Sequence, residues 1–199
     1  MIRFIHCNDY ARVLRIWQAC FGDEESYVRF FWENCFPQCR GLIYEAGGQA
    51  VSMLFLLPGT LAYKKTSLPA EYVYAVATMP EYRGRGYATE LTKQAAGIAQ
   101  SEGKSALCLR PGEESLYGYY AKLGFVKAFA RHERAARRGC FAWSPPVEEY
   151  IRRESELTGR ELFYRPMENP GGMLLPLGRD AEKWLRKTKG RAYMGPALE

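Results

Sequence analysis

The sequence predicts a mixed α/β fold, and three patterns along the chain support this prediction. Apolar residues recur at helical spacing in residues 8–37, residues 41–80 hold short runs of β-forming residues, and residues 86–130 alternate between the two patterns. A chain of 199 residues fits one α/β domain, or one domain with an appendage. We therefore expect helices first and then the order ββββαβαβ.

Two helices are predicted ahead of the strands. Residues 8–22 open with a capping candidate, Asn8 or Asp9, and Gly22 ends their helical pattern. Residues 23–37 carry acidic residues near the start, where the helix dipole favours negative charge, and a proline after the end. Each segment has one apolar face that a sheet can cover.

Short β-type runs follow, and their spacing predicts four strands, at residues 41–46, 50–58, 60–67 and 70–80. Gly47 and Gly48 join the first two as a hairpin. The fourth run is apolar with little alternation, as expected for a central strand that is covered on both faces.

The remaining elements are predicted from the same periodicities. The middle of the chain continues with a helix over 86–103, a strand over 105–111, a helix over 113–124 and a strand over 125–130. Beyond it we expect an irregular basic stretch over 130–140, a helix over 145–159, strand-like residues over 160–178, a basic helix over 179–190 and a final strand within 191–199. There is no internal repeat or low-complexity segment.

Composition excludes several classes of protein. No run of 18 apolar residues is present, so we expect no membrane span, and polar residues from position 6 argue against a signal peptide. The six cysteines form no C-x-x-C pair and there are only two histidines, so we expect no metal site. Reduced cysteines suit the cytoplasm. The net charge of +6 allows acidic partners, such as a phosphorylated cofactor or nucleic acid.

The stretch ATMPEYRGRGYATEL, residues 77–91, has the properties of an anion site. It lacks the G-x-x-x-x-G-K-[ST] pattern, and Thr89 stands where a dinucleotide motif needs its third glycine. Yet a strand, a short basic loop and a helix start follow one another, and a helix N-terminus offers amide donors. Gly84 and Gly86 permit close backbone approach, and Arg83 and Arg85 can pair with phosphate oxygens. The alternative is a tight turn that merely exposes two arginines.

This loop resembles the acyl-CoA-binding loop of the GNAT superfamily of N-acetyltransferases. The family pattern is R/Q-x-x-G-x-G/A, which Arg83, Gly86 and Ala88 match in order. The resemblance implies a mixed, mostly antiparallel central sheet with a splayed strand pair, flanked by helices. It covers residues 1–130, the expected catalytic core, and leaves 131–199 as an extension that packs on or completes the same domain.

A second hallmark of the family lies 37 residues after Arg83. It is a Y-x-x-x-G-F sequence at the end of a helix, here Tyr120, Gly124 and Phe125. The family often begins this helix with Asn, whereas this chain has Glu113, which puts one polar contact to the cofactor in doubt. Residues near position 20 also resemble a bacterial subgroup akin to multi-acetylating aminoglycoside-modifying enzymes.

The resemblance implies an N-acetyltransferase that moves an acetyl group from acetyl-CoA to a primary amine by direct attack in a ternary complex. Holding both reactants together supplies much of the rate advantage of such a complex. The implied cofactor-binding residues are Val76, Ala77 and Thr78 along the pantetheine arm, and Arg83, Gly84, Arg85, Gly86, Tyr87 and Ala88 around the pyrophosphate.

The resemblance also implies the proton-transfer groups. Tyr120 occupies the general-acid position, where its hydroxyl can protonate the departing thiolate. The alternative is a tyrosine that is packed for stability. Glu71, at the start of the fourth strand, is a candidate base, although a glutamate there is more often a solvated surface residue. The carboxylate of Glu199 is a second candidate.

Two competing functions remain open from the sequence. A non-catalytic member of the family would bind acyl-CoA as a regulator or scaffold. A nucleic-acid-binding protein would use two basic clusters, one of Arg131, Arg134, Arg137 and Arg138, and one of Lys183, Arg186, Lys187, Lys189 and Arg191. No nucleic-acid motif accompanies these clusters. The resemblance instead implies acetyl-CoA and an amine, from a small molecule or a protein, as partners.

Overall fold

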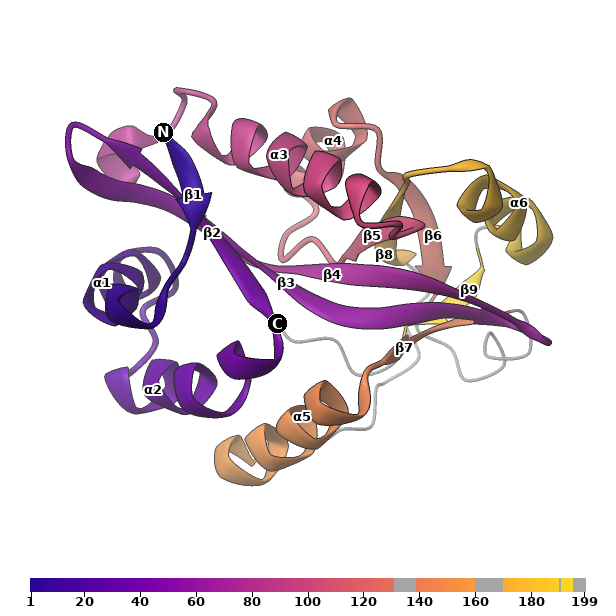
Figure 1. Cartoon of the computed structure of the whole chain (residues 1–199), viewed down its shortest axis with the longest axis horizontal. Coiled ribbons are helices and arrows are strands. Elements are labelled where there is room, and N and C mark those ends of the chain that lie inside the picture. The colour runs from indigo at the N-terminus through magenta and orange to yellow at the C-terminus, as the bar shows by residue number, and fades with distance from the viewer. Residues whose placement is uncertain (131–138, 160–169, 190, 195–199) are drawn as a thin grey trace. The chain divides into compact units, whose positions relative to one another are not determined.

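The chain folds into nine strands and six α-helices over the residues that the structure, a computed structural model, describes: 1–130, 139–159, 170–189 and 191–194 (Figure 1). The helices are α1 Tyr10–Phe21, α2 Glu25–Asn34, α3 Tyr87–Ser101, α4 Ser115–Lys122, α5 Pro145–Thr158 and α6 Arg179–Thr188. The strands are β1 Ile2–Phe4, β2 Arg40–Ala46, β3 Gln49–Tyr63, β4 Thr66–Thr78, β5 Ala106–Leu109, β6 Val126–Ala130, β7 Cys140–Trp143, β8 Pro170–Pro176 and β9 Ala192–Met194. Three 3-10 turns are η1 Cys7–Asp9, η2 Phe36–Gln38 and η3 Pro80–Tyr82. Among these residues, no helix has both the length and the apolarity to cross a membrane.

Two compact units make up the chain. The first contains Met1–Leu57 and Val73–Gly97, and the second contains Pro58–Tyr72 and Ile98–Glu199. In the first unit, β1 pairs antiparallel with β2, and β2 pairs antiparallel with β3. The apolar faces of α1 and α2 supply the aromatic core, in which the Trp17 ring lies 5.0 Å from Phe31, 5.9 Å from Phe55 and 5.8 Å from Tyr74. Burial of such large rings contributes strongly to the stability of this unit.

The second unit holds the remaining strand pairs. β4 pairs parallel with β5, and β8 then lies antiparallel between β5 and β6. β9 pairs parallel with β6. β7 pairs parallel with β9 and antiparallel with β3. The sheet is therefore mixed, mostly antiparallel and flanked by helices, which confirms the predicted fold class.

The predicted strands at 50–58 and 60–67 are wrong as separate elements. β3 runs without a break through Pro58 and Gly59, and the chain reverses later, where Lys64 adopts a φ of 52°. Proline has no N–H to donate, but the Pro58 carbonyl still accepts a hydrogen bond from the Ser144 N–H, so the strand keeps this link at Pro58. At Gly59 the Phe141 ring fills the space that a Cβ would need. Proline and glycine here mark a close strand contact and not a turn.

The other differences lie where the sequence pattern is short. β1 and β7 were not predicted, since strands of three and four residues leave little periodicity. The remaining helices and strands lie where they were predicted, and Gly22 ends α1 in the left-handed conformation, at a φ of 74°. The cluster Arg131–Arg138 and Glu199 lie outside the described residues, and the division of the chain at residue 130 stays a prediction.

Candidate functional site

The end of β4 departs from regular strand geometry. Ala75 has a φ of 49°, which is rare for any residue with a Cβ and distorts the strand just before Val76. The next residues, Ala77 and Thr78, are the last of the strand. A residue that is held in this sparsely populated conformation marks a local distortion of the backbone. The predicted pantetheine-binding segment, 76–78, therefore has a distinct local geometry.

Ser52 of β3 holds this segment in place. Its hydroxyl is 2.7 Å from the Ala77 carbonyl, to which it donates, and 2.8 Å from the Thr78 hydroxyl. Because Ser52 has only one hydroxyl hydrogen, Thr78 must donate in the second bond. The Met79 N–H also donates to the Val51 carbonyl, at 2.9 Å. The sequence did not single out Ser52, because 25 residues separate it from Ala77.

Arg83 turns back towards the strand end. Its Nε donates to the Thr78 carbonyl at 3.1 Å, and the Cys20 thiol of α1 donates to the same oxygen at 3.3 Å. Burial raises the pKa of Cys20 even though the Arg83 guanidinium lies beside it, so this thiol stays protonated at neutral pH. The contact places a charged guanidinium at the beginning of the glycine-rich loop. Cys20 is a second residue that sequence reasoning missed.

The loop itself uses both glycines for their backbone freedom. Gly84 has a φ of 76° and Gly86 a φ of 83°, in the left-handed region that favours glycine. A Cβ at either position would meet no atom within 4 Å, so packing does not exclude a side chain there. The requirement is conformational, and the space next to both glycines is open to a ligand.

α3 begins directly after this loop, with Tyr87. The first hydrogen bond of the helix runs from the Glu90 N–H to the Gly86 carbonyl, at 3.0 Å. The amides of Tyr87 and Ala88 precede it, so they have no acceptor within the helix. The positive end of the helix dipole lies at the same place. This arrangement of donors is suited to a phosphate group.

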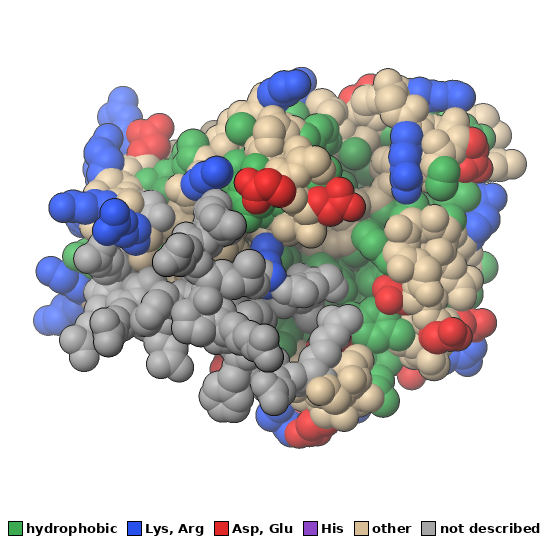
Figure 2. Space-filling model, turned by 180° about the vertical axis from the view of Figure 1, so that it is seen from behind, with side chains coloured by type: hydrophobic (Ala, Val, Ile, Leu, Met, Phe, Trp, Pro, Cys, Tyr) green, Lys and Arg blue, Asp and Glu red, His purple; other side chains and the backbone are tan. Residues whose placement is uncertain are grey.

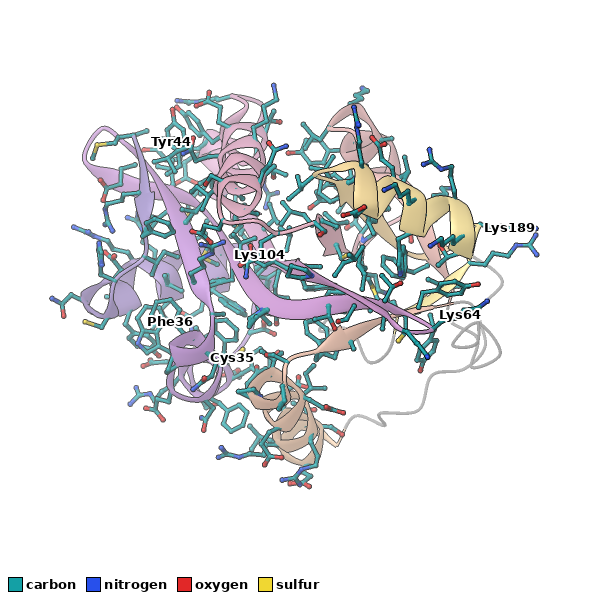
Figure 3. The ribbon with its side chains drawn as sticks, turned by 45° about the vertical axis from the view of Figure 1, so that its right-hand side comes forward. Cys35, Phe36, Tyr44, Lys64, Lys104 and Lys189 are labelled. Atoms are coloured by element: carbon teal, nitrogen blue, oxygen red, sulfur yellow. The ribbon has the colours of Figure 1, made fainter. Side chains whose placement is uncertain are left out.

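Aromatic contacts and hydrogen bonds hold the start of α3 and the loop before it. The Tyr87 ring lies 4.4 Å from the ring of Tyr44 on β2, which Figure 3 labels, and the Tyr44 hydroxyl donates to the Glu90 carboxylate. Burial and this carboxylate raise the pKa of Tyr44. On the other side of the loop, Arg85 donates to the Glu81 carbonyl at 3.2 Å and lies over the Tyr82 ring. Both loop arginines are exposed.

Tyr120 lies in the second unit, on α4, with only 7% of its surface exposed. Its ring contacts Phe125 edge-on at 5.6 Å and Tyr119 at 4.9 Å. Its carbonyl accepts the Phe125 N–H at 3.1 Å, after Gly124 has turned the chain with a φ of 91°. Burial, with a smaller contribution from Tyr119, raises the pKa of the Tyr120 phenol. The phenol is therefore protonated at neutral pH.

Glu71 lies in the second unit on β4, opposite Leu107 of β5. Its exposed fraction is 4%, so the interpretation of Glu71 as a solvated surface residue was wrong. The strand begins at Thr66, which places Glu71 inside it and not at its entrance. A buried carboxylate is costly unless it has partners, so such a residue needs a structural or functional reason.

The structure brings together, in the first unit, all of the predicted cofactor-binding residues: Val76, Ala77, Thr78, Arg83, Gly84, Arg85, Gly86, Tyr87 and Ala88. The two predicted proton-transfer residues, Tyr120 and Glu71, belong to the second unit. In the described part of the chain, no three His, Cys, Asp or Glu side chains lie close enough together to hold a metal ion.

The basic residues of the C-terminal part are exposed wherever the structure describes them. On and after α6 these are Lys183, Arg186, Lys187, Lys189 and Arg191. Figure 2 shows Lys and Arg side chains gathered at the left edge of the face it presents. Lys183 pairs with Asp180 of the same helix at 3.1 Å. Nucleic-acid binding through this surface stays a hypothesis.

Comparisons with known proteins place these features in context. A family model described as an acetyltransferase (GNAT) domain matches residues 1–128. No curated protein matches the chain closely enough to indicate common descent. Solved structures match at low identity, which shows a shared fold.

Three structures illustrate this likeness. The GNAT family N-acetyltransferase YhbS from Escherichia coli, in complex with CoA, has a TM-score of 0.62 at 14% identity, and the match covers 98% of this chain and 87% of that one. A probable N-acyltransferase from Enterococcus faecalis has a TM-score of 0.59 at 17% identity, over 65% of this chain and 33% of that one. The ribosomal-protein-S18-alanine N-acetyltransferase from Escherichia coli has a TM-score of 0.57 at 15% identity, over 90% and 94%.

Proposed function

Since the chain belongs to the GNAT family of acetyltransferases, we propose that it transfers an acetyl group from acetyl-CoA to a primary amine by direct attack in a ternary complex. The observation that carries this proposal is the loop from Arg83 to Ala88. Two left-handed glycines, which alternate with Arg83 and Arg85 along the chain, lead into a helix whose first amides have no acceptor within the helix. A structural relative in complex with CoA supports the choice of cosubstrate.

We assign the pyrophosphate of acetyl-CoA to this loop. The amides of Gly86, Tyr87 and Ala88 would donate to its oxygens, and the Arg83 and Arg85 side chains would add charge. In the described structure Arg83 is held by the Thr78 carbonyl, which keeps its guanidinium near the loop. Gly84 contributes by its conformation.

The pantetheine arm is assigned to the end of β4, at Val76, Ala77 and Thr78. The carbonyls of Ala77 and Thr78 already accept hydrogen bonds from Ser52 and Arg83. The contacts to the arm would therefore come from the other backbone groups of this segment. Ser52 has a positioning role, because it fixes two residues of the segment at once.

In the chemical step we propose that the neutral amine attacks the thioester carbon, and that the tetrahedral intermediate expels the CoA thiolate. Tyr120 would give its phenolic proton to this thiolate, since its raised pKa keeps it protonated, and would regain a proton from the nitrogen of the intermediate, directly or through water. Glu71 would accept the proton that the ammonium form of the substrate must lose, directly or through water. Both residues remain candidates, and the acceptor is a small-molecule or protein amine.

We also propose that residues 131–199 complete the domain that residues 1–130 begin. β8, at Pro170–Pro176, lies between β5 and β6 and hydrogen-bonds with both. A catalytic core that ended at residue 130 would leave both of these strands without their shared neighbour.

Acetyl-CoA binding and turnover test the proposal in two steps. Thermal unfolding is measured with and without acetyl-CoA, with ATP as a control anion, and thiol release is then followed over a panel of small amines and peptide N-termini. A ligand that binds only the folded state adds about 2.7 kcal/mol at a concentration of ~100 Kd. We expect a shift with acetyl-CoA and thiol release with some amines.

Each step can contradict a different part of the proposal. If acetyl-CoA leaves the unfolding midpoint unchanged, the assignment of the loop fails. If acetyl-CoA stabilises the protein but no amine releases thiol, the chain is a non-catalytic acyl-CoA-binding protein, and the roles of Tyr120 and Glu71 fall away.

A further inference from the structure

Two cysteines lie on either side of the short turn η2, between α2 and β2. Cys35 follows the last residue of α2, where its N–H donates to the Phe31 carbonyl at 2.8 Å, and its side chain is fully buried. Cys39 directly precedes β2 and is partly exposed. Their thiols are hydrogen-bonded to each other. The turn therefore brings a buried and an accessible thiol into direct contact.

The turn that joins these thiols is held from several directions. The Gln38 N–H donates to the Cys35 carbonyl at 2.9 Å, and the Cys39 N–H donates to the Phe36 carbonyl at 3.1 Å. Phe36, labelled beside Cys35 in Figure 3, stacks on Trp32 with ring centroids 4.2 Å apart and 14° between the planes. Its ring also contacts Phe55 of β3 at 5.9 Å. Because the turn is packed, the two thiols are placed before any reaction begins.

We propose that Cys35 and Cys39 are a redox-active pair, which forms a reversible disulfide by exchange with low-molecular-weight disulfides. Cys39, as its thiolate, attacks one sulfur of the small disulfide, forms a mixed disulfide and releases the first small thiolate. The thiolate of Cys35 then attacks the Cys39 sulfur and releases the second. The pair loses two electrons and two protons, and one small disulfide becomes two small thiols.

The order of attack follows from the surroundings of the two sulfurs. Cys39 is the one that a small molecule can reach. The hydrogen bond with Cys39 and burial both raise the pKa of Cys35, which makes Cys35 a poor first nucleophile. Once Cys39 carries a small thiol, Cys35 is already in contact with it, so the second step is intramolecular. This inference does not depend on the proposed acetyl transfer.

The distribution of arginines makes the pair easy to follow by mass spectrometry. Trypsin releases residues 30–40, FFWENCFPQCR, which contain Cys35 and Cys39 and no other cysteine. Cys7, Cys20 and Cys108 each fall in a different tryptic peptide. The folded protein is treated with oxidised glutathione, quenched in acid, alkylated and digested. We expect the 30–40 peptide to lose two hydrogen atoms and to carry no alkyl group, and dithiothreitol to reverse the change.

Variants separate the two steps. With Cys35→Ala, glutathione should remain on Cys39 as a stable mixed disulfide. With Cys39→Ala, the peptide should stay unmodified, because Cys35 is buried. The peptide that contains the exposed Cys7 is the internal control for an ordinary surface thiol, which should accumulate only a glutathione adduct.

The wild-type measurement decides the proposal even if a variant does not fold. Two alkyl groups on the 30–40 peptide after treatment, with Cys7 already glutathionylated, would overturn it. A glutathione adduct that persists on Cys39 in the wild-type chain would also overturn it, since Cys35 would then be unable to complete the exchange.

Discussion

The phenol of Tyr120 illustrates how burial determines the chemistry of a single residue. The side chain is buried and contacts two aromatic rings, and its pKa is raised above the ordinary value of about 10. A packing role and a role in acid catalysis are therefore compatible, because the burial that stabilises the ring also keeps the hydroxyl group protonated. The two interpretations that the sequence left open for Tyr120 need not exclude each other.

For Tyr120→Phe we expect kcat to fall by about 100-fold, because the thiolate would lose the proton donor that we propose for it. The affinity for acetyl-CoA, measured by calorimetry, should change little, and the fold should persist because the ring is kept. In the wild-type enzyme, no fall in rate attributable to Tyr120 should occur below pH ~10. Full activity in the variant would remove Tyr120 from the mechanism.

Asp9 is a second buried residue whose surroundings change its pKa, and its role is structural. Its carboxylate is 5% exposed and accepts hydrogen bonds from Arg3 at 2.7 and 2.9 Å, from Arg12 at 2.9 Å and from the His6 N–H at 2.9 Å. The hydrogen bonds from Arg3 are the main reason why the pKa of Asp9 lies well below its usual range. These bonds tie β1 and η1 to the start of α1.

Because the pKa of Asp9 is lowered on folding, its contribution to stability is complete above the unfolded value of about 3.9 and is lost as the pH falls below it. Asp9→Asn should lower the free energy of unfolding by about 2 kcal/mol at pH 7, measured by urea titration, and the difference should shrink towards pH 2. Asp180→Asn removes an exposed ion pair and should cost less than about 1 kcal/mol. Equal losses in the two variants would contradict this account.

At the level of elements, glycines in α3 and in the turn before it allow the effect of backbone conformation on stability to be tested without an effect of packing. Gly84 and Gly86 are left-handed, whereas Gly97 lies inside α3 without a positive φ. A Cβ added at any of the three would meet no atom within 4 Å. The three substitutions to alanine therefore differ only in the backbone conformation that alanine must adopt.

We expect Gly84→Ala and Gly86→Ala each to cost about 1–2 kcal/mol in the free energy of unfolding and to weaken acetyl-CoA binding. Gly97→Ala should instead stabilise the protein by about 0.5–1 kcal/mol, because alanine favours helix and restricts the unfolded chain. Denaturant titration measures the free energy of unfolding of all three variants, and calorimetry measures the affinity of the two loop variants for acetyl-CoA. Unchanged affinity in both loop variants would argue against this loop as the pyrophosphate site.

On the scale of the whole molecule, the second unit depends on its C-terminal strands. The family model ends at residue 128, yet β8 lies between β5 and β6 and pairs with Leu107, Cys108 and Val126. Removal of β8 would expose two strand edges, and the buried side chains of Met173 and Leu174 would no longer cover their neighbours. The matched segment is therefore shorter than the folded unit.

A chain of residues 1–130 should fail to fold cooperatively. We expect it to aggregate or to bind a dye specific for exposed apolar surface, whereas the full chain gives one sigmoidal denaturant transition or two separate ones. Circular dichroism and size-exclusion chromatography distinguish the outcomes. A monomeric 1–130 fragment with a cooperative transition would show that the core is independent of residues 131–199.

The sequence by itself determined the fold class, most of the helices and the loop at Gly84 and Gly86, because periodicity, capping residues and glycine conformation act over a few neighbouring positions. It could not reveal that β3 continues through Pro58 and Gly59, since the neighbour that makes this possible, Phe141, is 82 residues away. Only the tertiary structure decided the roles of Ser52 and Cys20 at the end of β4, the burial of Glu71 and the place of β8 between β5 and β6. Each of these depends on contacts between distant segments, and such contacts leave no local pattern in the chain.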